Sequence, residues 1–324
     1  TCCGEHTRNA LAMRTCLVAR AAKDNGAERV ILVEPDLFFS AQDRGPRPDH
    51  GKTDFPRRLA DYKKFDGQPF SSRLYAQLLK ASGIDEVLTV HNHSLTVQRL
   101  FSDEFPQGFH NLNPAELFAE YLMSDEMGNV ISHGRPIALC APDAGAEAFV
   151  RAVDTSIRKG VSDMLLAPSV GLLLMRKERN GERQVQISPS PDSPLQAADI
   201  AGRDVIVFDD MVRTGHTIVK CCEQLKELGA RRVVFVVTHF YSSEEVKENL
   251  NSPVIDEIVT TNSLPSVLNR DMQGRLRKKM LVLKIEKWIA DYLRKWLDLP
   301  SLHPGTALYS IDISGKNPRS RQAM

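Results

Sequence analysis

Ten residues decide the fold of this chain: Val207-Phe208-Asp209-Asp210-Met211-Val212-Arg213-Thr214-Gly215-His216. The apolar run ending at Phe208 predicts a buried strand, the Thr-Gly pair predicts a turn, and a helix is expected to begin near Thr217. Backbone N–H groups at such a turn can cradle a phosphate, aided by the helix dipole and threonine hydroxyls. Two adjacent carboxylates at a strand's carboxyl end are placed to bind ribose hydroxyls or a hydrated Mg²⁺. The stretch predicts a sugar-phosphate site; the alternative is an ordinary strand, turn and helix with an N-capping acid.

Length and composition narrow the class of protein. A chain of 324 residues is long enough for two α/β domains, each with its own core. The chain has 42 Lys and Arg residues and 41 Asp and Glu residues, so its net charge is +1, which gives no argument for a nucleic-acid partner. Any anion site must therefore be local.

The cysteines and the hydropathy indicate the compartment. The six cysteines are Cys2, Cys3, Cys16, Cys140, Cys221 and Cys222. Since no Cys-x-x-Cys spacing occurs, we expect reduced, mostly buried thiols and no structural zinc. No apolar run is long enough to span a bilayer and no signal peptide is visible, which predicts a cytoplasmic protein without a membrane partner. Because the chain begins at Thr1 and not at Met, we expect a fragment or a processed form.

Strand-like apolar runs alternate with stretches of helical spacing, which predicts an α/β fold of mainly parallel sheets flanked by helices. Strands are expected at 29–33, 86–90, 136–140, 164–167, 204–208, 232–238, 257–261 and 279–283. Helices are expected at 10–25, 72–82, 114–124, 144–159, 217–228 and 285–297.

Interruptions of this pattern predict the domain organisation. Glycines and polar residues at 125–135 place a boundary between a domain at 1–130 and a second at 131–300, followed by a partly ordered tail at 301–324. The polar stretches 45–64 and 180–194 are expected to be loops.

Further polar groups follow other predicted strands. Asp143, in Pro142-Asp143-Ala144-Gly145, is either an acid facing a ligand or a helix N-cap. His91 and His93 are too closely spaced for a confident zinc site; one of them is expected beside Mg²⁺ or a triphosphate and the other to be structural. Residues 175–179, Met-Arg-Lys-Glu-Arg, supply either mobile cations for phosphoryl transfer or a solvated loop. Residues 38–44, which include two phenylalanines, line an adenine pocket or form a loop with buried rings.

The order of these landmarks resembles the ribose-phosphate pyrophosphokinases, also called PRPP (phosphoribosyl pyrophosphate) synthetases. The resemblance covers roughly residues 5–297, and the Pro-Asp-Ala-Gly and Asp-Asp-Met blocks are its most specific parts. It implies two tandem domains of the type I phosphoribosyltransferase fold, the first truncated at its start. It also implies a homo-oligomer that transfers diphosphate from ATP to the C1 hydroxyl of ribose 5-phosphate, with Mg²⁺ as cofactor and AMP released.

The resemblance assigns roles to individual residues. It implies that ATP is bound by Phe39, Gln42, Asp43 and His93, and the metal by His93 and Asp143. The catalytic residues are Lys177 and Arg179 of a flexible loop, together with His93. Ribose 5-phosphate is bound by Asp209, Asp210, Arg213, Thr214, Gly215, His216 and Thr217.

The chain also departs from the family pattern. Ala41 stands where the family has an Arg that contacts ATP, His91 replaces an Asp, and His216 replaces a small residue. The family's first strands and an acidic Asp-Gly-Glu block precede the point where this chain starts, and 45–64 has the character of an insertion. The ribose-phosphate half is therefore better supported than the ATP half.

Arg213 replaces an acid inside the phosphate-binding stretch. Its five-donor fork either strengthens phosphate binding or points to solvent.

Two other functions remain compatible with the sequence. One is a catalytically weak relative that binds nucleotide or sugar phosphate and regulates a partner; the other is a phosphoribosyltransferase.

Overall fold

A computed structural model describes residues 7–51, 56–124, 136–161, 170–180, 184–300 and 307–312 of the chain. The contacts divide the chain into two compact units, Thr1–Asn113 and Pro114–Met324. The boundary predicted near residue 130 falls within 125–135, which lie outside the described residues, so the predicted domain ranges stay a prediction. No helix in the described ranges is both long enough and apolar enough to cross a bilayer.

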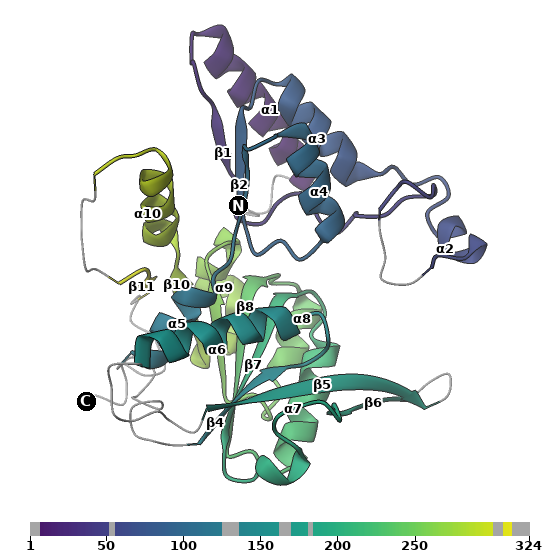
Figure 1. The fold of residues 1–324 in the computed structure, drawn as a ribbon, viewed down its shortest axis with the longest axis vertical. Coiled ribbons are helices and arrows are strands. Elements are labelled where there is room, and N and C mark those ends of the chain that lie inside the picture. The colour runs from purple at the N-terminus through teal and green to yellow at the C-terminus, as the bar shows by residue number, and fades with distance from the viewer. Residues whose placement is uncertain are drawn as a thin grey trace. The chain divides into compact units, whose positions relative to one another are not determined.

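The first unit contains a three-stranded parallel sheet in the order β1-β2-β3 (Figure 1). Its strands are β1 (Ile31–Val33), β2 (Glu86–Val90) and β3 (Phe109–Leu112), and its helices are α1 (Arg8–Asp24), α2 (Leu59–Lys63), α3 (Ser71–Ala81) and α4 (Leu95–Glu104). Helices α1, α3 and α4 bury Ala19, Leu79 and Phe101 in one core cluster with Val87 of β2. Strand β3 and helix α4 escaped the sequence analysis, and α2 lies in the stretch expected to be a loop.

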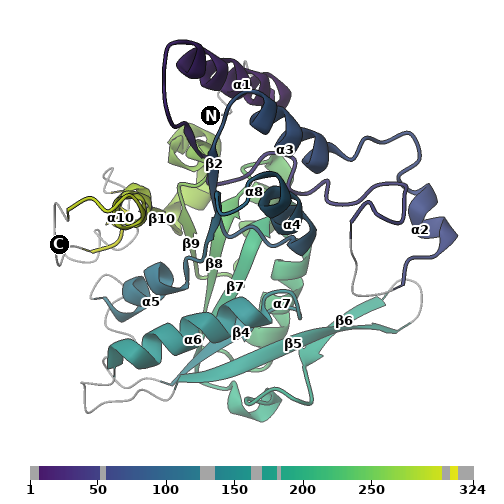
Figure 2. The same cartoon turned by 45° about the horizontal axis from the view of Figure 1, so that its top comes forward.

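The second unit contains an eight-stranded sheet in the order β11-β10-β9-β8-β7-β4-β5-β6, of which β6 and β11 are antiparallel to their neighbours (Figure 2). Its strands are β4 (Ile137–Ala141), β5 (Val170–Asn180), β6 (Gln184–Pro189), β7 (Asp204–Val212), β8 (Arg232–Phe240), β9 (Glu257–Thr261), β10 (Met280–Lys284) and β11 (Ser310–Ile311). Its α-helices are α5 (Ala115–Met123), α6 (Glu147–Val161), α7 (His216–Glu227), α8 (Glu244–Leu250), α9 (Arg270–Gln273) and α10 (Glu286–Trp296).

Helices cover both faces of this larger sheet. Phe208 of β7 makes edge-to-face contacts with Phe118 of α5 and Phe149 of α6, which lie side by side over one face (Figures 1 and 2). On the other face, Cys221 of α7 joins a core cluster with Val207 of β7. The predicted α/β class is thus confirmed. Cys140, Cys221 and Cys222 are buried free thiols, as the sequence predicts.

The strand order reverses at β4. The chain proceeds from β4 to β5 on one side and then returns to place β7 on the other side, so the carboxyl ends of β4 and β7 are neighbours. Open α/β sheets bind their ligands at such a switch point, outside the carboxyl ends of the strands. This topology brings the Asp143 turn, which follows β4, next to the acid pair of β7.

Two element predictions in the second unit differ from the structure. Strand β7 does not end at Phe208 but continues to Val212, because its second half pairs with β8, Asp209 opposite Val237 and Val212 opposite Phe240. The stretch 180–194 is not simply a loop, since β6 pairs antiparallel with β5. The alternation Gln184-Val185-Gln186-Ile187 was the overlooked strand signal. The strand predicted at 164–167 lies outside the described residues.

Candidate functional site

The turn after β7 has the geometry of an anion cradle. Gly215 adopts φ +82°, a left-handed conformation that glycine accepts readily, and it caps α7. A Cβ built on Gly215 would lie 3.1 Å from Leu250 Cδ2, so close packing also favours glycine. The helix starts at His216, one residue before the predicted start, and the first N–H groups of a helix have no intrahelical acceptor. Thr214 and His216 are exposed beside these N–H groups.

Three carboxylates gather beside the cradle. The backbone N–H of Asp210 donates to Asp209 Oδ1 at 2.9 Å, and the N–H of Gly145 donates to Asp143 Oδ1 at 3.1 Å. Burial raises the pKa of the Asp209 carboxyl well above its ordinary value, and the charges of Asp210 and Asp143 raise it further. The site therefore has an excess of negative charge that a cation or a hydrogen-bond donor would relieve.

The donor chemistry fits a hard cation that is only partly enclosed by protein. Across the described ranges, no three His, Cys, Asp or Glu side chains form a group that could hold a metal ion by themselves. Mg²⁺ usually binds one or two carboxylates and completes its shell with water and substrate oxygens. The oxygens of Asp143, Asp209 and Asp210 suit that mode better than a closed cage.

Arg213 and His216 both have neighbours within the second unit. The Arg213 guanidinium lies over the ring of Tyr241, 5.4 Å from its centroid. The His216 Nδ1 atom lies 3.5 Å from a carboxylate oxygen of Glu245. Arg213 is exposed and stacks on Tyr241, and its contribution to phosphate binding stays a prediction.

Lys177 and Arg179 lie on a β-ribbon, whereas the resemblance implied a flexible loop. Their backbones pair with Ile187 and Val185 of β6. The parallel register of Ala141 with Leu174 places both residues beyond the end of β4, on the edge that carries Asp143. Their side chains lie outside the described part of the structure, so their catalytic roles stay predictions.

In the first unit, the predicted ATP-site segments meet at the carboxyl ends of β1 and β2. The Ser94 hydroxyl donates to Asp43 Oδ2 at 2.8 Å, and the Ser72 hydroxyl donates to the Gln42 carbonyl at 2.8 Å. His93 is exposed next to Ser94, which also accepts the N–H of Val97 and so caps α4. Sequence reasoning missed Ser94, although a Ser before a helix is an N-cap signal.

The loop that presents His93 is fixed by Asn92. Its backbone N–H donates to Asn111 Oδ1 at 2.9 Å, and its carbonyl accepts from Asn111 Nδ2 and from Gln98 Nε2. Asn92 Oδ1 in turn accepts the N–H of Ser94. Buried Asn92 thus orders the loop around an exposed histidine. His93 and Asp143 belong to different units, and their joint role at one metal ion stays a prediction.

Phe39 is half-buried and packs within the first unit. Its ring meets that of Tyr75 edge-on, with 5.2 Å between centroids. The Tyr75 hydroxyl donates to the buried Glu34 carboxylate at 3.1 Å, and the N–H of Phe38 donates to the same carboxylate at 3.0 Å. These contacts fit the second of the two interpretations of residues 38–44, a loop with buried rings. A contact of Phe39 with adenine stays a prediction.

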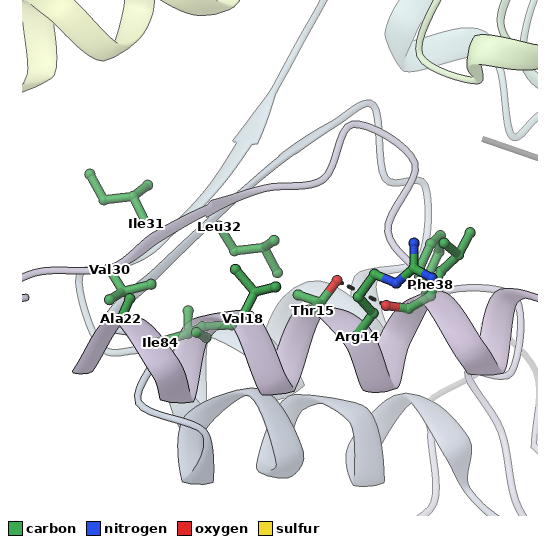
Figure 3. A pocket seen from close by; sticks show the side chains of 11 residues that line it. Arg14, Thr15, Val18, Ala22, Val30, Ile31, Leu32, Phe38 and Ile84 are labelled. Atoms are coloured by element: carbon green, nitrogen blue, oxygen red, sulfur yellow. Dashed lines mark hydrogen bonds between the residues drawn. The ribbon is translucent and has the colours of Figure 1, made fainter. Parts of the chain in front are cut away.

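A separate apolar hollow of about 400 Å³ lies between α1 and β1 (Figure 3). Its walls include Leu11, Val18, Val30, Leu32 and Phe38, with Arg14 at the margin. Phe39, Gln42, Asp43 and His93 are not among its lining residues, so it is distinct from the predicted ATP segments.

The second unit combines a switch-point α/β sheet with an acid pair and a glycine-capped helix start, the arrangement in which open α/β sheets bind ligands. The profile of the Phosphoribosyl synthetase-associated domain matches residues 181–303. Ribose-phosphate pyrophosphokinase 2 of Saccharomyces cerevisiae is 27% identical over 269 residues, 83% of this chain and 70% of that protein. The Ribose-phosphate pyrophosphokinase of Pasteurella multocida is 27% identical over 283 residues, 87% of this chain and 75% of that protein.

The fold agrees with these matches. The crystal structure of phosphoribosylpyrophosphate synthetase from Mycobacterium smegmatis superposes with a TM-score of 0.64 at 23% identity, over 90% of this chain and 78% of that one. The fold is that of the phosphoribosyltransferase-like α/β proteins, and the sequence is similar to the ribose-phosphate pyrophosphokinases.

We expect the free energy of unfolding to decrease as Asp209 ionises. The folded state holds this proton more tightly than the unfolded chain, where an aspartate titrates near 3.8, so the stabilisation is present at low pH and lost as the pH rises through the folded-state pKa. Asp209→Asn, which stays neutral, should remove that decrease, and the exposed Asp192→Asn should retain it. Urea unfolding between about pH 4 and about pH 8 measures the slopes. Equal slopes in all three proteins would contradict the prediction.

Glu34 should give a second pH dependence. Burial raises its pKa from 4.5 to about 7, with Asp36 adding to the rise while hydrogen bonds from Phe38 and Tyr75 and the Arg8 charge oppose it. The stabilisation is complete below about pH 4.5 and disappears as the pH passes about 7. In Glu34→Gln the loss of stability between about pH 5 and about pH 9 should shrink, as measured by thermal unfolding. The exposed Glu28→Gln is the control, and a wild-type-like loss in Glu34→Gln would refute the idea.

Proposed function

We propose that this protein is a ribose-phosphate diphosphokinase, which transfers diphosphate from ATP to the C1 hydroxyl of ribose 5-phosphate and yields PRPP and AMP. The observation that carries the proposal is the switch point, where Asp143, Asp209 and Asp210 meet the Gly215 cradle at the start of α7. The similarity of the sequence to ribose-phosphate pyrophosphokinases supports the same reaction.

The ribose half of the reaction follows from the chemistry of the second unit. The N–H groups at the start of α7 and the hydroxyls of Thr214 and Thr217 bind the 5-phosphate, with Arg213 and His216 at the rim. Asp209 and Asp210 accept hydrogen bonds from ribose hydroxyls. This anchoring fixes the C1 oxygen, which releases its proton to solvent water and attacks the β-phosphorus in line. The bond from the β-phosphorus to the α–β bridging oxygen breaks, and AMP leaves with that oxygen.

The remaining groups act on the triphosphate. Phe39, Gln42, Asp43 and His93 contact ATP, and Lys177 and Arg179 neutralise charge on the transferring oxygens. In the second unit Asp143 would hold Mg²⁺, whose contribution when bound is to neutralise phosphate charge. We further expect the active form to be a homo-oligomer.

The decisive assay is incubation with ATP, Mg²⁺ and ribose 5-phosphate. The proposal requires AMP and PRPP to accumulate together in equal amounts. Formation of ADP, or no turnover, contradicts it.

Ala41 in the ATP segment favours a second candidate, a catalytically weak regulatory protein. That candidate predicts ribose 5-phosphate binding without AMP formation.

Lys177→Ala and Arg179→Ala should each reduce kcat by at least about a hundredfold, the usual effect of removing one preorganised charge-stabilising donor. The Michaelis constants for ATP and ribose 5-phosphate should change little, because the side chains act where charge redistributes. Lys287→Ala, which removes an exposed charge from α10, is the control. If ATP affinity collapses while kcat holds, these residues bind ATP and do not serve the chemical step.

A further inference from the structure

A side chain outside every motif is attached to the phosphate cradle. Asn249 lies near the end of α8, 35 residues beyond Thr214 in the chain, and its Nδ2 donates to the Thr214 carbonyl at 2.7 Å. The same nitrogen lies 3.4 Å from His216 Nδ1. Asn249 thus touches the residues on both sides of Gly215.

Helix α8 holds Asn249 firmly in this place. Its Val246 and Leu250 side chains are fully buried in the core cluster of the second unit, and the Ser243 hydroxyl caps the helix by accepting the Val246 N–H. Leu250 also packs against Gly215, within 3.1 Å of the position that a Cβ would occupy. Because these buried anchors lie on the same short helix, Asn249 has little freedom to leave the Thr214 carbonyl.

This bond controls the direction of one peptide plane. In a trans peptide the carbonyl and the following N–H point in opposite directions, so fixing the Thr214 carbonyl toward α8 turns the Gly215 N–H away from α8. Glycine accepts φ of either sign, so rotation of this peptide is cheap without an external restraint. A rotated peptide would remove an N–H donor from the cradle and present a carbonyl oxygen, which repels a phosphate.

We infer that Asn249 is a positioning residue of the ribose 5-phosphate site: it holds the Thr214–Gly215 peptide in the orientation that donates to the 5-phosphate. This inference rests on the proposed function. Asn249 does not touch the substrate; it acts through the backbone of Thr214 and Gly215. Glu245 lies on the same helix beside His216, but it offers no donor to the Thr214 carbonyl.

The test compares Asn249→Ala and Asn249→Asp with wild type. The alanine variant removes the donor, and we expect its dissociation constant for ribose 5-phosphate to rise about fivefold, the factor that corresponds to one typical hydrogen bond. The aspartate variant keeps the shape but places a carboxylate against the carbonyl and near the phosphate, so its loss should be larger. Calorimetric titration of the full chain with ribose 5-phosphate, without ATP, measures both. Glu248→Ala, on an exposed neighbouring position, should bind as wild type does.

Steady-state kinetics and thermal unfolding separate positioning from general damage. A positioning role raises KM for ribose 5-phosphate while leaving kcat and KM for ATP near wild type and Tm nearly unchanged. Binding in both variants as tight as in wild type overturns the inference and leaves the proposed function standing. A parallel weakening of ATP and ribose 5-phosphate together with a large drop in Tm also overturns it. Wild-type protein that binds no ribose 5-phosphate overturns the proposed function and this inference with it.

Discussion

The reversal of strand order at β4 is the constraint on which the candidate site depends. With β5 on one side of β4 and β7 on the other, the turns after β4 and β7 open onto the same edge of the sheet. The carboxyl ends of parallel strands lie together, so Asp143 and Asp209, which are 66 positions apart in sequence, come to interact electrostatically. The ribbon of β5 and β6 extends from the same edge, beside the Asp143 turn.

That arrangement has an electrostatic cost. Asp209 is held in a partly buried position between other carboxylates, which disfavours its ionised form in the protein without ligand. The helix dipole and N–H groups at the start of α7 supply positive potential at this edge of the sheet. The large apolar core beneath, with Val207, Phe235 and Leu225 fully buried, provides the stability that tolerates such a site.

The two units use the same device for different segments. In the second unit Asn249 holds the turn after β7; in the first unit Ser94 holds the segment after β1, and Asn111 of β3 holds the loop after β2. In each case a polar side chain on a neighbouring element fixes a loop whose own sequence does not determine its shape. Exposed residues such as His93 and Thr214 therefore lie on backbone that these hydrogen bonds hold in place.

The sequence by itself determined the features that depend on local physics. The α/β class follows from hydrophobic periodicity. The glycine at 215 indicates the turn before the helix, because few other residues accept φ +82°. The start of α7 was therefore placed within one residue. The order of the motifs indicates the same proteins to which the sequence as a whole is similar, since each motif is a short local stretch.

Tertiary structure alone decided what depends on partners distant in sequence. Strand β7 continues through Asp209 and Asp210 because β8 pairs with it, although two acids in a row end an apolar pattern. The contacts of Ser94 with Asp43 and of Asn249 with Thr214 join residues 51 and 35 positions apart. Such hydrogen bonds form only after the elements pack, and they leave no periodic trace in the sequence.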